Sequence, residues 1–248
     1  MNAKVWLVGA GPGDPELLTL KALRALREAH VVLIDDLVNP AVLEHCAQAR
    51  IIAVGKRGGC RSTPQAFIQR LMLRHARQGR CVVRLKGGDP CIFGRGGEEA
   101  LWLQEQGIEV EIVNGITAGL AGATQCGIPL TLRGISRGVT LVTAHTQDDS
   151  ELNWSGLVQG GTTLVLYMGV ARLDVIRRGL LEAGMAPSTP VAMIENASLP
   201  QQRECRSQLK HMEEDAKAFA LSSPAILVIG EVVGAAVQAS LELQMLAG

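Results

Sequence analysis

Short apolar runs alternate with segments of helical spacing through the first half of the chain. The run Val5–Val8 is uninterrupted and is followed by a glycine, which is typical of a strand buried on both faces of a parallel sheet. Leucines then recur at helical spacing from Glu16 to Ala29 and predict a helix. Further strands are expected at Val31–Ile34, Ile51–Val54, Cys81–Leu85 and Glu109–Val113, and further helices at 41–47, 64–78 and 98–106. This alternation predicts an α/β fold with a mainly parallel sheet.

A second series of elements starts near residue 130. It comprises strands at 138–143, 162–167, 190–194 and 225–229, a helix at 171–183, and an outer strand and helix within 201–220. The segment 117–130 between the two series is rich in alanine and glycine, and we expect a short helix there that bridges two α/β domains. We place the N-terminal domain at residues 1–116 and the C-terminal domain at residues 117–248.

The composition indicates a large aliphatic core and no dominant charge. Hydrophobic residues make up 47% of the 248 residues but aromatic residues only 3%, so aliphatic side chains must fill the core. Acidic and basic residues balance at 24 each. A nucleic-acid-binding protein would show a basic excess or a basic stripe, so we expect no nucleic-acid partner.

Cysteines and histidines are scattered along the chain. The six cysteines form no CxxC pair, which indicates a reduced cytoplasmic protein without a disulfide framework. The five histidines do not cluster, so no metal site is expected. The N-terminus lacks the pattern of a signal peptide, and the apolar segment 225–239 is too short to span a bilayer, so no membrane association is expected.

The segment Arg84–Glu99 is the strongest candidate for a ligand-binding loop. It carries five glycines after a predicted strand, and it leads into a helix with acidic residues in its first turn. Glycine lets a backbone approach a ligand closely because no Cβ intervenes. A simple turn between a strand and a helix would need only one or two glycines, so we interpret the segment as part of a binding site.

The earlier loop Gly9–Gly13 follows the first strand and partly matches the dinucleotide fingerprint G-x-G-x-x-G. Asp14 occupies the position of the third glycine, and its charge would repel a pyrophosphate. Pro12 also removes a backbone N–H that could face a phosphate. We therefore disfavour an NAD site, although the loop still lies where α/β proteins bind ligands.

Taken together, these segments resemble the uroporphyrinogen-III C-methyltransferase family within the tetrapyrrole methylases. The matching segments lie in register from residue 5 to residue 233, and Arg84–Glu99 is the most specific of them. The others are Val8–Lys21, Asp35–Val38, Val54–Arg57, Gly115–Thr117, Gly127–Thr131, Tyr167–Gly169, Pro190–Ala192 and Gly230–Val233.

The resemblance implies a particular fold and reaction. Two α/β domains would hold the active site in the cleft between them, and the protein would be a homodimer. S-adenosyl-L-methionine would donate methyl groups to C2 and C7 of uroporphyrinogen III, giving precorrin-2 and S-adenosyl-L-homocysteine. Sirohaem, cobalamin or haem d1 biosynthesis would use the product.

The resemblance also implies roles for individual residues. Asp35 would accept a proton, Lys56 would donate one, and Arg95 would take part in catalysis. The tetrapyrrole would contact Arg95, Glu98, Arg133 and Met168. The cofactor site would be lined by Pro12, Gly87, Gly88, Asp89, Ile92, Thr117, Ala118, Met168 and Ala197.

Elementary chemistry is consistent with these roles but leaves alternatives open. A carboxylate such as Asp35 can accept a ring proton, or it can simply cap a helix. Arginine binds carboxylates well but is a poor base, so we interpret Arg95 mainly as a substrate anchor, or else as one partner of a structural ion pair with Glu98. Asp89 can accept from the cofactor or form a turn before proline, and Met168 can line the cofactor site or pack in the core.

The sequence leaves two other functions open. The protein could methylate a later precorrin in cobalamin biosynthesis, although the Arg95–Glu98 block favours uroporphyrinogen III. It could also be an NAD-binding sensor or scaffold without chemistry. Assays with each substrate separate methylation of uroporphyrinogen III from methylation of a later precorrin. Tight binding of NAD without binding of S-adenosylhomocysteine would identify the sensor or scaffold.

Overall fold

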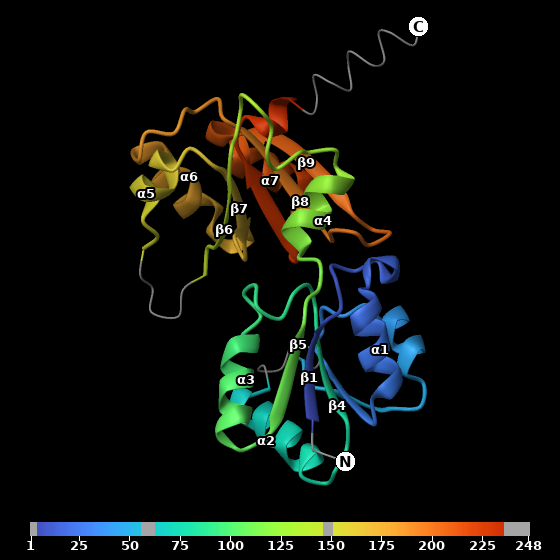
Figure 1. The fold of residues 1–248 in the computed structure, drawn as a ribbon. Coiled ribbons are helices and arrows are strands. Elements are labelled where there is room, and N and C mark those ends of the chain that lie inside the picture. Colours follow the sequence, from blue (N-terminus) through green and yellow to red (C-terminus); the bar gives the residue numbers. More distant parts are fainter. Residues whose placement is uncertain (1–3, 56–62, 146–150, 236–248) are drawn as a thin grey trace, which may run out of the picture. The chain divides into compact units, whose positions relative to one another are not determined.

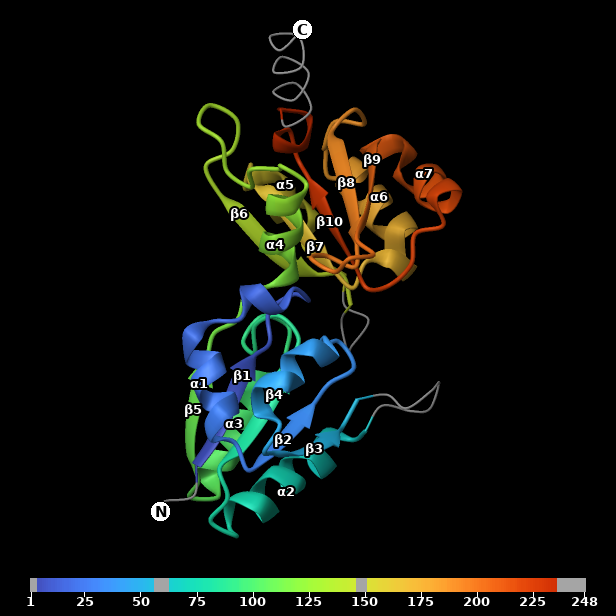
Figure 2. The ribbon, with the colours of Figure 1, turned by 90° about the vertical axis from the view of Figure 1, so that its right-hand side faces the viewer.

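The computed structural model describes residues 4–55, 63–145 and 151–235. The chain divides into two compact units, Met1–Thr117 and Ala118–Gly248. Each unit is built on its own five-stranded sheet (Figures 1 and 2). No helix in the described ranges is both long enough and apolar enough to cross a bilayer.

The sheet of the first unit is parallel throughout, in the order β3-β2-β4-β1-β5. Its strands are β1 (Lys4–Gly9), β2 (Val31–Ile34), β3 (Arg50–Ala53), β4 (Val82–Lys86) and β5 (Glu109–Val113). Helices cover both faces, which explains why the central strands read as continuous apolar runs. The helices are α1 (Leu20–Glu28), α2 (Gln65–Ala76) and α3 (Gly96–Glu105).

The two faces of this sheet carry separate cores. Helix α1 packs Ala25 and Leu26 on one face, together with the 3₁₀ segment Pro40–Cys46. Helices α2 and α3 pack residues such as Met72 and Leu103 on the other face (Figure 1). The first helix is shorter than the leucine spacing predicted, because a separate 3₁₀ turn precedes it and the Thr19 hydroxyl accepts from Ala22 N at 3.1 Å, capping a helix that begins at Leu20.

The second unit has the strand order β6-β7-β10-β8-β9. The α/β class is confirmed, but this sheet is mixed: only β6 and β7 pair in parallel, and the three other pairings are antiparallel. The connection from β8 to β9 is too short for a crossover helix, so the chain reverses there. The strands are β6 (Val139–Thr143), β7 (Thr163–Tyr167), β8 (Pro190–Glu195), β9 (Arg203–Gln208) and β10 (Ala225–Ile229).

Helices again cover both faces of this sheet. One face carries α5 (Trp154–Gln159), α6 (Leu173–Glu182) and α7 (Met212–Phe219). The other face carries α4 (Ala118–Gln125), whose small residues explain the alanine- and glycine-rich segment. A Cβ on Gly122 would lie 3.0 Å from the Cβ of Ala197, so a larger residue would push the helix off the sheet. Helix α5 was not expected from the sequence; it is short, and the Asn153 side chain caps it through Gly156 N.

Three loops of the first unit meet backbone against backbone at the carboxyl ends of β1, β4 and β5. A Cβ on Gly115 would lie 2.1 Å from the carbonyl oxygen of Gly88 and 2.8 Å from the Cα of Gly9. A Cβ on Gly9 would lie 2.6 Å from the same oxygen. Glycine is therefore required at both positions to bring these loops together.

We predict that Gly115→Ala destabilises the protein by about 3 kcal/mol or more, because the added methyl overlaps backbone atoms that cannot move aside. Gly97→Ala is the matched control: nothing lies within 4 Å of its added Cβ, and alanine in helix α3 should stabilise by about 0.5–1 kcal/mol. Urea denaturation of both variants checks the prediction. Equal stability of the two variants would contradict it.

Candidate functional site

The carboxyl edge of the parallel sheet carries most of the candidate residues of the first unit. Parallel α/β sheets bind ligands at this edge because the loops after several strands meet there. The candidates follow β1, β2, β4 and β5 in turn: Pro12, Asp35, Gly87, Gly88, Asp89, Ile92, Arg95, Glu98 and Thr117. Lys56 lies outside the described residues.

The loops after β1 and β4 are bonded to each other. Ala10 N donates to Lys86 O at 2.7 Å, and Gly11 and Gly88 exchange two backbone hydrogen bonds. Gly88 has φ +68°, a conformation that other residues adopt only with strain. A Cβ on Gly87 would lie 2.9 Å from Leu37 Cβ in the loop after β2. The glycine pair thus brings a bare stretch of backbone to the ligand-binding edge.

Asp89 joins the loop after β4 to the loop after β5. Its side chain is buried; Oδ1 accepts from Cys91 N at 2.8 Å, and Oδ2 accepts from Gly115 N at 3.0 Å. The Asn114 amide lies 3.5 Å from Oδ2. The turn interpretation and the ligand interpretation are therefore compatible, because each carboxylate oxygen can accept more than one hydrogen bond.

Beneath these loops lies a cluster of four charged side chains, Asp35, Arg84, Lys86 and Glu99, called here the buried quartet. Arg84 is 2% exposed and Glu99 is fully buried, while Asp35 is only partly covered. Arg84 Nη2 lies 2.5 Å from Asp35 Oδ1, and Arg84 Nε lies 3.3 Å from Glu99 Oε1. Lys86 Nζ lies 3.4 Å from Glu99 Oε2 and 3.7 Å from Asp35 Oδ2. Two cations and two carboxylates therefore balance inside the protein.

The surroundings of the quartet explain its geometry. Arg84 and Lys86 are two residues apart on β4, so both side chains point to the same face of the sheet. Helix α3 covers this face and supplies Glu99 from its first turn. Gln65 Nε2 at the start of α2 donates to Glu99 Oε1 at 2.7 Å. Burial lowers the pKa of Lys86 and the neighbouring Arg84 adds to this, while Glu99 and Asp35 oppose it. The carboxylates thus stabilise the buried ammonium group.

The sequence predicts only part of the quartet. It makes Asp35 a candidate, but it gives Arg84, Lys86 and Glu99 only as members of the Arg84–Glu99 motif. The signal that could have identified them is two basic residues inside an otherwise apolar strand, since buried charges require partners. Their partners, however, come from other elements and could not be assigned from spacing.

Arg95 and Glu98 form the ion pair that their spacing predicts. Arg95 Nη2 lies 2.6 Å from Glu98 Oε2, and Arg95 Nε contacts both carboxylate oxygens. The hydrogen bond from Arg95 lowers the pKa of Glu98. Both side chains are exposed, at 45% and 57%, so the pair contributes little stability. The Arg95 backbone has φ +59° and that of Phe93 φ +53°, and such strain is common at ligand sites.

In the second unit, Met168 and Ala197 follow β7 and β8, which run in the same direction. Met168 has φ +56°, and its side chain is half exposed, so it is not a core residue of this unit. Ala197 lies between two residues of positive φ, Asn196 and Ser198. Ala118 starts α4, and Arg133 is exposed in the loop before β6. The turns after β7 and β8 therefore hold strained backbone at one edge of the sheet.

Comparison with known proteins gives one consistent result. The family model for the tetrapyrrole (corrin/porphyrin) methylases matches residues 4–213. A uroporphyrinogen-III C-methyltransferase of Pseudomonas fluorescens is 74% identical over 97% of this chain and 98% of its own length. One of Pseudomonas aeruginosa is 76% identical over 94% of this chain and 95% of its own length.

A solved structure agrees with the sequence comparisons. The uroporphyrin-III C-methyl transferase of Thermus thermophilus, complexed with S-adenosyl homocysteine, superposes with a TM-score of 0.81 and 43% identity. The match covers 94% of this chain and 99% of that chain.

We predict that Glu99→Gln destabilises the fold by about 3–5 kcal/mol, because it leaves two buried cations with one partly exposed carboxylate. Glu98→Gln, one residue earlier on the same helix, removes only an exposed pair and should cost less than about 1 kcal/mol. Urea denaturation at neutral pH checks both values. A Glu99 variant as stable as the Glu98 variant would show that the quartet does not support the fold.

Proposed function

This chain belongs to the tetrapyrrole (corrin/porphyrin) methylases, and on that basis we propose that it methylates uroporphyrinogen III at C2 and C7 to give precorrin-2. The observation that carries the proposal is the 74–76% identity, over nearly the whole chain, to relatives named for that reaction. The same identity favours uroporphyrinogen III over a later precorrin as substrate. The methyl donor is S-adenosyl-L-methionine, whose product occupies the Thermus thermophilus relative.

The glycine loops of the first unit fit such a donor. Gly87 and Gly88 present backbone without side chains at the ligand-binding edge, and Asp89 braces the turn that holds them. S-adenosylmethionine, when bound, supplies a methyl group already activated by the positive sulfur. The protein's contribution is alignment, which can supply roughly 7–11 kcal/mol of a barrier. The proposed cofactor residues are Pro12, Gly87, Gly88, Asp89, Ile92, Thr117, Ala118, Met168 and Ala197.

Recognition of the substrate rests on exposed guanidinium groups. Uroporphyrinogen III carries carboxylates around an apolar ring, and arginine binds carboxylates with two parallel hydrogen bonds. Arg95 is exposed and its side chain is oriented by Glu98, so we assign it to one substrate carboxylate. Arg133 is exposed in the second unit and is assigned the same role. Met168 would contact the apolar ring.

Asp35 is the proposed acceptor of the ring proton that leaves after methylation. Its carboxylate lies at the carboxyl end of β2 and is partly exposed. Arg84 and Lys86 contact one oxygen each from the buried side, so they fix its orientation. The C–H bond at the ring carbon breaks, its electron pair stays in the macrocycle, and the proton goes to this carboxylate, which releases it to water. Lys56 remains a proposed proton donor, and no separate step is assigned to it.

We further propose that the protein works as a homodimer in the cytoplasm, which light scattering and cell fractionation test.

The decisive experiment incubates the protein with S-adenosylmethionine and uroporphyrinogen III and measures product mass. Two added methyl groups are expected, with formation of S-adenosylhomocysteine. A parallel reaction contains precorrin-2 as acceptor. Methylation of precorrin-2 without methylation of uroporphyrinogen III would reject the proposed substrate, and tight NAD binding without S-adenosylhomocysteine binding would reject the reaction class.

We predict that Asp35→Asn lowers kcat about 100-fold or more, because an amide cannot accept the ring proton. Affinity for S-adenosylhomocysteine should be retained. Asp36→Asn changes the neighbouring, exposed carboxylate and should leave kcat within about twofold. Steady-state kinetics with both variants checks the assignment, and equal rates would remove Asp35 from the reaction.

We predict that Asp89→Ala weakens S-adenosylhomocysteine binding about tenfold or more, because Cys91 N and Gly115 N both lose their acceptor and the loop is no longer braced. Calorimetry measures the affinity, and circular dichroism confirms that the variant is folded. Glu98→Gln serves as control, since Glu98 is assigned to the substrate side. Wild-type affinity in a folded Asp89 variant would contradict the assignment.

A further inference from the structure

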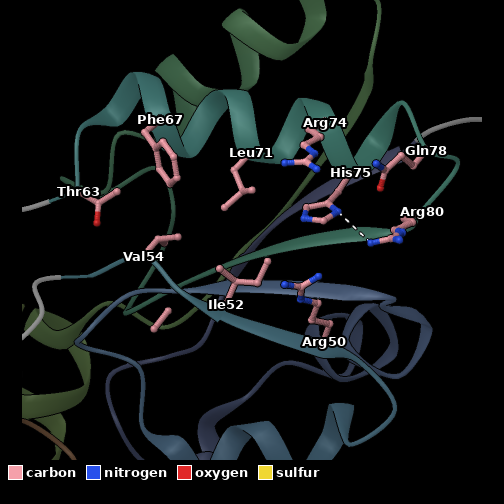
Figure 3. A pocket seen from close by; sticks show the side chains of 11 residues that line it. Arg50, Ile52, Val54, Thr63, Phe67, Leu71, Arg74, His75, Gln78 and Arg80 are labelled. Atoms are coloured by element: carbon pink, nitrogen blue, oxygen red, sulfur yellow. Dashed lines mark hydrogen bonds between the residues drawn. The ribbon is translucent and has the colours of Figure 1, made fainter.

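A cavity of about 620 Å³ lies in the first unit between edge strand β3 and helix α2 (Figure 3). Strand β3 is the edge strand of the sheet and pairs with β2; among the described residues, no strand covers its other side. Helix α2 packs residues such as Ile68 and Met72 against the sheet. The volume lies within the range of small-molecule sites. The lining residues are Arg50, Ile52, Ala53, Val54, Thr63, Phe67, Leu71, Arg74, His75, Gln78 and Arg80.

One face of α2 is turned toward this cavity. Phe67, Leu71 and Arg74 of α2 are spaced by four and three residues and so lie on one side of the helix, and Gln78 continues this side in the turn after it. That side is apolar at its first two positions and polar at its last two. Figure 3 shows the same division across the cavity, with Phe67 and Leu71 toward one end and Arg74 toward the other.

The polar end gathers three guanidinium groups around a buried histidine. Arg50 comes from the start of β3, Arg74 from α2, and Arg80 from the turn before β4. Arg80 Nη1 donates to His75 Nδ1 at 3.1 Å (Figure 3). Burial lowers the pKa of His75, and all three arginines lower it further. His75 is therefore a neutral acceptor at neutral pH and does not add to the charge.

Within the part of the chain that the structure describes, no acidic side chain balances these three positive charges in the cavity wall. None of the described lining residues is an aspartate or glutamate. Among residues 4–55, 63–145 and 151–235, Arg50, Arg74 and Arg80 take part in no salt bridge with an acidic side chain. Three adjacent like charges repel one another, and an anion between them relieves that repulsion. Guanidinium groups also match phosphate and carboxylate oxygens geometrically.

The other end of the cavity is apolar and open. Phe67 is 50% exposed, although phenylalanine is usually buried and this chain has few aromatic residues to fill its core. Leu71, Ile52 and Val54 complete this wall. A flat apolar body placed here would cover the Phe67 ring.

We propose that this cavity is a second ligand site, which binds an organic anion: a phosphate or carboxylate between Arg50, Arg74 and Arg80, and an apolar body against Phe67 and Leu71. The cationic end lies near the amino ends of β3 and β4, because Arg50 begins β3 and Arg80 precedes β4. The proposed methyl-transfer residues of this unit lie at the carboxyl ends of the strands. The anion-binding end of the cavity is therefore at the opposite edge of the sheet from those residues, while its apolar end, with Val54, reaches the carboxyl end of β3.

Calorimetry with the full-length protein tests this site, in the presence of saturating S-adenosylhomocysteine. The probes are naphthyl phosphate and naphthoate, each of which joins an anionic group to an apolar ring system. Inorganic phosphate represents the anionic group alone, and naphthol represents the apolar ring system alone. One molecule of naphthyl phosphate or naphthoate should bind per chain, about tenfold or more tighter than phosphate or naphthol. The comparison of the two naphthyl probes identifies the preferred head group. Absence of a preference for the joined molecule would overturn the proposal.

Variants locate the binding. Arg50→Gln and Arg74→Gln should each weaken the preferred probe about tenfold, and Phe67→Ala should weaken it about threefold. Arg70→Gln and Arg77→Gln are matched controls, because both arginines are exposed on or next to α2 but do not line the cavity. Arg95→Gln tests for binding at the proposed substrate site. These three controls should retain affinity within about twofold.

The opposite pattern would overturn the proposal. If Arg95→Gln or the α2 controls weaken binding as much as Arg50→Gln, the probe binds elsewhere or nonspecifically. If Arg50→Gln and Arg74→Gln change the molecular mass measured by light scattering but leave probe affinity unchanged, the arginines belong to an interface between copies of the chain. Thermal melts establish that each variant is folded, and the conservative Arg74→Lys variant, which keeps the charge, should recover part of the lost affinity.

Discussion

The structure of the candidate site depends on one fully buried carboxylate. Glu99 faces Arg84 and Lys86 from the first turn of α3, and without it two cations would remain deep in the first unit with only Asp35 to balance them. The contacts join β2, β4 and α3 at the edge where the ligand loops begin. They also hold the proposed base from below while one side of its carboxylate stays accessible. Stability and chemistry therefore share the same charged groups.

Glycine has two separate purposes around this edge. At Gly9 and Gly115 it permits backbone atoms of three loops to meet, so these positions are structural. At Gly88 it permits a left-handed backbone in the turn proposed for the donor, and the turn is braced by Asp89. The glycines around this edge are thus explained partly by packing and partly by the proposed access for a ligand. The simple turn, which is the alternative interpretation of this segment, is one component of the same arrangement.

The second unit supplies its candidate residues in a different way. Its sheet is mixed, and strained non-glycine residues occur after β7 and β8, at Met168, Asn196 and Ser198. Helix α4 approaches the sheet closely because Gly119 and Gly122 leave no side chain in the way, and Tyr167 Oη accepts from Gly119 N. Packing of small residues and backbone strain shape this edge, together with the buried carboxylate of Glu195, which lies 2.5 Å from Arg203 Nη2.

Local patterns in the sequence determined the α/β class, most strands, and the glycine-rich loops, because hydrophobic period and the need for glycine are properties of neighbouring residues. The Arg95–Glu98 pair was also predictable from its spacing of three residues, which brings side chains together around a helix start, although Arg95 itself precedes helix α3. Tertiary structure alone decided that β10 runs antiparallel between β7 and β8, and that Arg84 meets Glu99 and Asp35, which lie 15 and 49 residues away. It alone brought Arg50, Arg74 and Arg80 to one cavity. These contacts join elements that are distant in the sequence. Which residues meet depends on the order of the strands and the placement of the helices, and the local hydrophobic periodicity of the sequence does not encode either.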